Sequence, residues 1–242
     1  MEKKPATHKG EGHRKRLRER FLNNGLHGFQ DYEVLELLLS LNTPRQDTKQ
    51  QAKDLIDTFG SLHRVMEADP KALCAVKGVG PANSFGIRLI KAAADRYLEA
   101  RILNRDVIQD QNNLLAYLEH HMAHKDRENF LGIFLDAKNR VIASEILFRG
   151  TLTASAVYPR EVIARALHHQ AAAMIFAHNH PSGDIQPSTE DRRITRQLCL
   201  ALKFSGILVH DHMIVGKQGH FSFAAQGLVA EYLEEFKRFD SE

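Results

Sequence analysis

The sequence has few cysteines and no long apolar segment. Its two cysteines, Cys74 and Cys199, are too few for a disulfide framework. We expect two buried thiols rather than a bridge, which suits a reducing compartment and predicts a cytoplasmic location. No run of about 20 apolar residues is present, so the sequence predicts no contact with a membrane. The charged N-terminus also lacks the apolar segment of a secretory signal.

The first hundred residues have the pattern of a helical domain. Strong helix formers and apolar stripes predict four helices, at residues 31–39, 48–59, 69–76 and from 81 to about 97. Gly60 is placed to end the second helix, and Asp69 with Pro70 is placed to begin the third. A polar stretch near residues 102–112 interrupts this pattern. We therefore expect an all-α domain over residues 1–103.

Two features of this part suggest contact with DNA. The segment Val76–Ala82 carries Gly78 and Gly80 between two short helices and resembles a helix-hairpin-helix motif, in which backbone amides face a phosphate. Residues 1–20 hold eight basic and three acidic side chains, a cluster suited to phosphates. The alternatives are a packing module that never touches nucleic acid and a solvated basic arm. No segment resembles a base-reading helix or an aromatic stacking series.

The rest of the chain alternates strand and helix signals. Strands are expected at residues 129–135, 141–148, 171–177, 207–215 and 220–223, and helices at 114–123, 161–169, 189–204 and 226–238. This order predicts a second domain, over residues 114–242, built as an α/β sandwich with a mixed sheet.

The most specific motif lies after the third expected strand. His178 and His180 stand two apart at its end, so both side chains can leave on the same side. Ser188 and Asp191 follow, with Asp191 in the first turn of the next helix, where its charge is favoured. Two imidazoles and one carboxylate are a ligand set for catalytic zinc, with a fourth position left for water. Ser188 and Asp191 also form a capping-box-like pair that needs no metal, but capping leaves both histidines unexplained.

The spacing His-x-His-x7-Ser-x2-Asp resembles the JAMM motif of the JAB/MPN metalloproteases. Within that superfamily the chain is similar to the RadC family, which shares strings such as Phe148–Thr151, Pro159–Glu161 and Asp211–Gly216. The resemblance implies a JAB/MPN-type fold after the helical domain. It also implies Zn²⁺ held by His178, His180 and Asp191, with Ser188 bound to the site or to the tetrahedral intermediate.

A JAMM hydrolase also needs a glutamate that takes the proton of the attacking water. Two glutamates are candidates for this role. Glu145 lies on an expected strand, as the superfamily pattern has it, and Glu161 lies at the start of an expected helix within a string typical of RadC. We favour Glu161. Their other interpretations are a solvent-facing strand residue and a carboxylate that stabilises the start of its helix.

Three functions follow from these patterns. The first is a zinc metallopeptidase or isopeptidase that acts on a peptide or protein. The second, which the DNA-repair association of RadC implies, is a DNA-binding accessory protein whose zinc domain is weakly catalytic or inactive. The third is a nuclease, ranked last because a single His₂Asp site suits phosphodiesters less well than two metals do. The pair His210 and His212 is interpreted as support behind a ligand histidine or as buried polar residues.

Overall fold

The computed structural model describes residues 11–43, 46–107, 110–123, 125–150, 157–216 and 219–239. The chain forms two compact units that divide between Ala94 and Asp95, inside helix α6 (Pro81–Ile102). The described part of the first unit is helical, and the second combines helices with a sheet. The expected order, an all-α region followed by an α/β domain, is confirmed.

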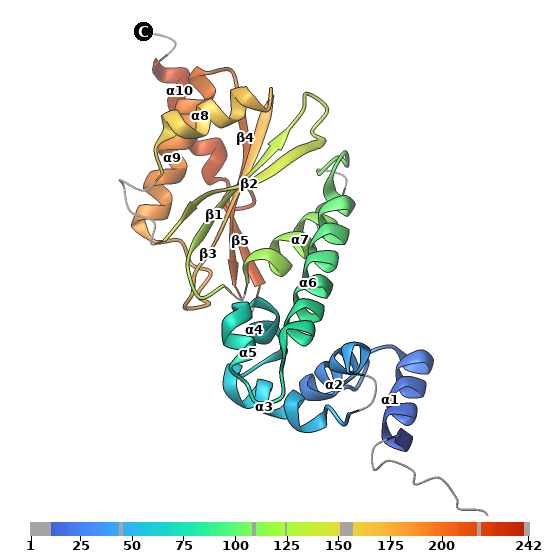
Figure 1. Cartoon of the computed structure of the whole chain (residues 1–242). Coiled ribbons are helices and arrows are strands. Elements are labelled where there is room, and N and C mark those ends of the chain that lie inside the picture. Colours follow the sequence, from blue (N-terminus) through green and yellow to red (C-terminus); the bar gives the residue numbers. More distant parts are fainter. Residues whose placement is uncertain are drawn as a thin grey trace, which may run out of the picture. The chain divides into compact units, whose positions relative to one another are not determined.

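The helices of the first unit pack against one another (Figure 1), and their core consists of aliphatic side chains. Its helices are α1 (Glu11–Asn24), α2 (Asp31–Asn42), α3 (Lys49–Phe59), α4 (Leu62–Glu67), α5 (Pro70–Cys74) and the first part of α6. Leu35, Leu39, Leu55, Leu73 and Ile87 are fully buried between them. Burial of such side chains is the main stabilising contribution, about 1.5–3 kcal/mol each.

The helix boundaries of this unit follow local chemistry. Gly60 ends α3 with a φ of +87°, a left-handed conformation that glycine adopts without strain. The Asp69 side chain accepts a hydrogen bond from the backbone N–H of Lys71, and Pro70 occupies the first position of α5. The predicted end of one helix and start of the other are confirmed.

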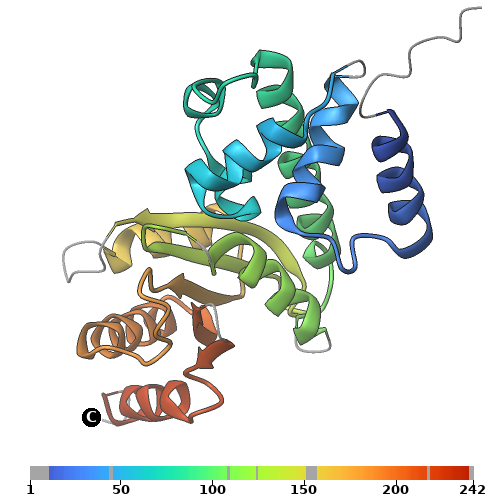
Figure 2. The ribbon, with the colours of Figure 1, turned by 90° about the horizontal axis from the view of Figure 1, so that it is seen from below.

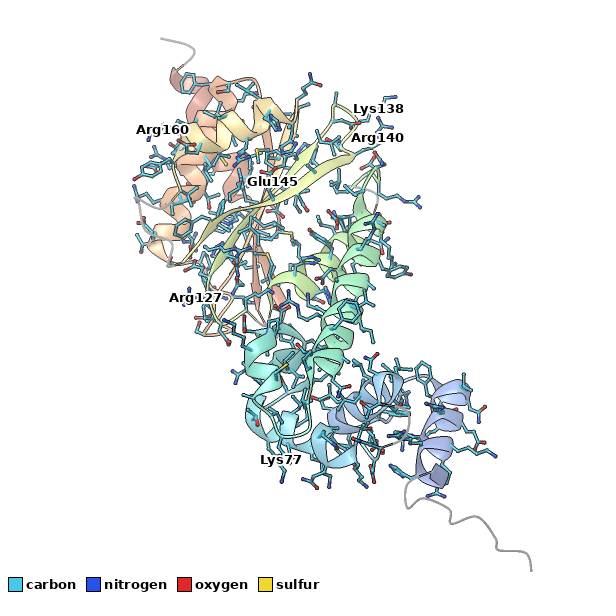
Figure 3. All side chains as sticks on the ribbon, in the orientation of Figure 1. Lys77, Arg127, Lys138, Arg140, Glu145 and Arg160 are labelled. Atoms are coloured by element: carbon cyan, nitrogen blue, oxygen red, sulfur yellow. The ribbon has the colours of Figure 1, made fainter. Side chains whose placement is uncertain are left out.

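The segment with the predicted hairpin joins α5 to α6. Gly78 has a φ of +81°, and Val76 and Val79 on either side of it are buried. Lys77 is exposed beside this turn (Figure 3). Two helices joined by a short turn agree with the local sequence pattern. The helix-hairpin-helix assignment and its contact with DNA stay predictions.

The basic cluster of residues 1–20 is described only in part. Three of its members lie outside the described residues: Lys3, Lys4 and Lys9. Within α1, Arg20 forms an ion pair with Glu33 at 2.6 Å and lies over the ring of Phe29 at 3.7 Å. At least one cation of the cluster therefore helps to hold α1 against α2.

The second unit contains a five-stranded mixed sheet in the order β2-β1-β3-β4-β5 (Figure 1). Its elements are α7 (Gln111–Met122), β1 (Asn129–Leu135), β2 (Val141–Arg149), α8 (Pro159–His168), β3 (Ala173–Asn179), α9 (Thr189–Phe204), β4 (Leu208–Gly216), β5 (Gly219–Ser222) and α10 (Leu228–Phe239). Strands β3 and β4 are parallel, and the other neighbouring pairs are antiparallel.

Helices cover both faces of this sheet. Phe130, Phe134 and Phe176 face α8, α9 and α10 in one core, and α9 lies against α10 (Figure 2). The opposite faces of the same strands carry side chains such as Leu131 and Ile133, which pack with α7 in a second core. The alternation follows from the two-residue period of a strand. Both faces being apolar explains why β1 and β3 are buried throughout.

The pairing of the strands brings the ends of three segments to one edge of the sheet. Strand β1 begins where β3 ends, because the two are antiparallel and Phe130 pairs with His178. Strand β4 ends at the same edge, because it is parallel to β3 and Ile214 also pairs with His178. The start of β1 and the ends of β3 and β4 therefore surround one point.

The two cysteines agree only in part with the expectation of two buried thiols. Both cysteines are free thiols; Cys199 is buried in α9, whereas Cys74 is exposed, so the expectation of two buried thiols is wrong for Cys74. Burial raises the pKa of Cys199 to about 12.

Within the described part of the chain, every helix is too short or too polar to span a bilayer.

Candidate metal centre

Four side chains converge at this edge of the sheet: Glu128, His178, His180 and Asp191. One potential ligand atom from each lies within 4.8 Å of the others. The Nε2 atoms of His178 and His180 are 3.0 Å apart, and they lie 3.2 Å and 3.4 Å from the two carboxylate oxygens of Asp191. Imidazole nitrogen and carboxylate oxygen are both common ligand atoms of zinc, and the cluster offers two of each.

Neighbouring backbone and side chains orient the two histidines. His180 Nδ1 lies 2.7 Å from the carbonyl oxygen of Asp184. A carbonyl only accepts, so this nitrogen carries a proton, and in the neutral imidazole Nε2 presents its lone pair to the cluster. His178 is fully buried, stacks on Phe130, and meets His212 Nε2 with its Nδ1 at 2.8 Å.

Asp191 is fixed by the start of α9. The backbone N–H and the hydroxyl of Ser188 donate to Asp191 Oδ2 at 2.7 Å and 2.6 Å, and the Asp191 N–H donates back to Ser188 Oγ at 3.1 Å. This is a capping box, as the sequence suggested, and it also points the carboxylate at the two histidines. Ser188 itself is exposed, whereas Asp191 is buried.

The charges of the cluster are coupled. Burial by itself raises the pKa of Asp191, but the adjacent imidazoles of His178 and His180 outweigh it and hold that pKa well below its usual range. The hydrogen bond to Asp191 in turn raises the pKa of His180 above its usual 6.5, against the opposing effect of burial. A buried and a half-buried imidazole beside an ionised carboxylate therefore attract a cation, whether a proton or a metal.

Glu128 is the member of the cluster that the sequence patterns did not single out. It directly precedes β1, and its Oε1 lies 4.0 Å from His178 Nε2. Buried Asn179 holds this segment, because its Oδ1 accepts from the backbone N–H of Asn129 at 2.9 Å and its Nδ2 donates to the carbonyl of Arg127 at 3.1 Å. The residue between the two histidines thus fixes the chain on either side of Glu128.

The two glutamates named from the sequence lie elsewhere. Glu145 is on β2, where it accepts from His169 at 2.7 Å and lies near Arg165. Figure 3 shows it part-way along that strand, away from Arg127. Glu161 is in the first turn of α8, with a side chain 69% exposed beside Arg160. Neither belongs to the cluster formed by the described residues. Glu161 has the alternative position at a helix start, whereas Glu145 is half-buried and paired with His169 instead of facing solvent.

A close backbone approach shapes the loop that follows His180. A Cβ atom on Gly216, at the end of β4, would lie 2.7 Å from the carbonyl oxygen of Gly183 and 2.7 Å from a methyl group of Ile185. Only glycine fits there without displacing the loop. This loop supplies the carbonyl of Asp184 that orients His180. The packing of the loop against the end of β4 therefore affects the position of His180 in the cluster.

Both domains match known families. Residues 108–228 match the model of the RadC-like JAB domain, and residues 12–85 match the model of the UPF0758 N-terminal domain. The first match includes all four residues of the cluster. The second covers α1 from its second residue, α2 to α5 and the start of α6.

Similar full-length proteins come from several bacteria. A UPF0758 protein of Ruegeria pomeroyi is 46% identical over 215 residues, which are 89% of this chain and 96% of that protein. One from Rhodobacter capsulatus is 46% identical over 213 residues, 88% of this chain and all of that protein. One from Nitrosospira multiformis is 43% identical over 214 residues, 88% and 96% of the two chains. The chain therefore belongs to the RadC family of UPF0758 proteins, in which a JAB domain follows a helical N-terminal domain.

Proposed function

We propose that this protein is a zinc-dependent hydrolase of the JAMM type that cleaves a peptide or isopeptide bond. The observation that carries the proposal is the approach of His178 Nε2 to His180 Nε2, 3.0 Å apart beside the buried carboxylate of Asp191. When both Nε2 atoms point their lone pairs at the same place, a cation between them removes the repulsion. The buried carboxylate of Asp191 balances the charge of that cation. His178, His180 and Asp191 would hold the zinc, which leaves one position open.

The remaining carboxylate is suited to carry the proton. Zinc at this site would lower the pKa of a water to about 7 and polarise a carbonyl. Asp191 is a poor base, because its pKa is held low and Ser188 donates twice to its Oδ2. Glu128 lies 4.0 Å from His178 Nε2 and keeps 11% of its side chain exposed, so we assign it the general base in place of Glu161 and Glu145. It takes the proton of the water and delivers it to the leaving amine.

Ser188 is assigned a supporting role in the same reaction. Its hydroxyl donates to Asp191 at 2.6 Å, which keeps that carboxylate oriented toward the histidines. Because the residue is exposed, the same hydroxyl is also within the part of the site that a substrate can reach. Its single proton can instead be donated to the oxygen on which charge develops during attack on a carbonyl, which requires the hydroxyl to turn away from Asp191.

Elemental analysis and a substrate panel test the proposal. The purified full-length protein is expected to contain one zinc per chain and to cleave some peptides or isopeptide-linked substrates, with cleavage abolished by a chelator and restored by zinc. Absence of a bound transition metal would overturn the proposal. Bound zinc without any turnover would favour the DNA-binding alternative, which salt-sensitive retention on duplex DNA would then test.

The raised pKa of His180 predicts an unusual pH dependence of zinc binding. Only the neutral imidazole binds zinc, and the proton competes once the pH falls through the pKa of the metal-free protein. Because Asp191 raises that pKa above 6.5, zinc affinity is expected to begin falling at a pH above 6.5, by up to about tenfold per unit for one proton. Competition with a chromogenic chelator between pH 6 and 8.5 measures it; an affinity that stays constant down to pH 6.5 contradicts the prediction.

A further inference from the structure

Behind the cluster lies a buried imidazole that touches no solvent. His212, on β4, is 0% exposed. Its ring stacks on Phe223 at 5.0 Å and meets Phe130 edge-on at 5.3 Å. A polar ring buried among aromatic side chains is costly unless both nitrogens are hydrogen-bonded. Both are: Nε2 lies 2.8 Å from His178 Nδ1, and Nδ1 lies 2.6 Å from the hydroxyl of Thr195.

The direction of the hydrogen bonds follows from the far end of this chain of contacts. Thr195, also 0% exposed, donates its hydroxyl proton to the backbone carbonyl of Asp191 at 2.5 Å. That proton is its only one, so toward His212 the hydroxyl oxygen accepts. Nδ1 of His212 therefore carries a proton.

The hydrogen bond between His178 Nδ1 and His212 Nε2 contains one proton. If His212 Nε2 also carried a proton, the ring would be a cation enclosed by aromatic side chains, which is strongly unfavourable. Nε2 of His212 is therefore an acceptor, and His178 Nδ1 donates to it. With its proton on Nδ1, His178 presents the lone pair of Nε2 to Asp191 and His180.

We propose that Thr195 and His212 are positioning residues that fix the tautomer of His178 before any metal is bound. The proposal rests on the zinc site of the proposed function and adds that the affinity of this site is set by the hydroxyl of Thr195, two hydrogen bonds away from the ligand atom. The start of α9 thereby contributes to the site twice, through the side chain of Asp191 and through its carbonyl.

The pair Thr195→Val and Thr195→Ser tests this relay. Valine has the shape of threonine but offers no acceptor, so His212 moves its proton to Nε2 and His178 is left with its proton on the ligand atom. We expect Thr195→Val to bind zinc 10- to 100-fold more weakly than wild type, the range seen when support behind a metal ligand is removed. Thr195→Ser keeps the hydroxyl and is expected to retain wild-type affinity. Competition with a chromogenic chelator measures both, and thermal unfolding shows that both are folded.

A second measurement separates this inference from the hydrolase proposal. Long-range ¹H–¹⁵N spectra of the metal-free wild type are expected to show His178 and His212 each protonated on Nδ1, and Thr195→Val is expected to move both protons to Nε2. His178 protonated on Nε2 in the wild type would overturn the relay, as would wild-type zinc affinity in folded Thr195→Val. If Thr195→Val fails to fold, His212→Phe removes both nitrogens from the same aromatic pocket and must weaken zinc binding. A wild type that binds no zinc defeats the hydrolase proposal, while the spectra still decide the tautomer.

Discussion

The Glu128→Gln protein is expected to lose hydrolysis, by about 10²- to 10⁴-fold in kcat, and to keep its zinc. Glutamine has the shape of glutamate and preserves the contacts of the segment that Asn179 holds, but it cannot accept the proton of the attacking water. Zinc content and initial rates on the best substrate of the panel measure the two properties on one preparation.

Two matched substitutions distinguish this role from a general effect of charge. Glu145→Gln and Glu161→Gln each remove one carboxylate from the same domain, yet Glu145 is paired with His169 and Glu161 is exposed. Both are expected to retain most of the wild-type rate. A rate lost in Glu161→Gln and kept in Glu128→Gln would restore the base that the sequence patterns favoured.

The second large effect is expected for Asp191→Asn, which should bind zinc more than about 100-fold more weakly, since even residues behind a ligand contribute 10- to 100-fold. Asparagine removes the negative charge but retains an oxygen that accepts from the backbone N–H of Ser188, so the start of α9 is preserved. Chelator competition measures the affinity, and circular dichroism shows that the helix remains.

Glu190→Gln is the control for this substitution. Glu190 is the neighbouring residue in the same first turn of α9, and its carboxylate is engaged by Arg193 at 2.6 Å instead of the cluster. Its removal changes the charge at the helix start by the same amount, so a long-range effect of charge would appear in both proteins. Equal zinc affinity in Asp191→Asn and wild type would remove Asp191 from the set of ligands.

The sequence predicted the elements and the histidine-aspartate part of the cluster well, because both depend on local signals. The apolar run before His178 made a buried strand, and α9 begins at Thr189 directly after its cap. Spacing alone could bring His178, His180 and Asp191 together, since they lie on one strand, one turn and one helix start. The parallel pairing of β3 with β4 was not predicted, because it depends on contacts across the sheet.

Glu128 was missed for the same reason. Asn129 and Asn179 are 50 residues apart in sequence and touch only because β1 runs antiparallel beside β3. The available signal was a carboxylate directly before a fully buried strand. There the chain enters the sheet, at the edge that also holds the end of β3. Local sequence patterns favour instead the string around Glu161, which begins α8.

The four groups of the cluster come from three separated stretches of chain: the residue before β1, the end of β3 and the first turn of α9. An unfolded polypeptide keeps these stretches far apart and has little affinity for the ion. Zinc held at the proposed site would therefore be thermodynamically linked to folding, and each tenfold rise in its free concentration above the dissociation constant would add about 1.4 kcal/mol to the stability of the JAB domain. The melting temperature of this protein would then report the free zinc concentration of its surroundings.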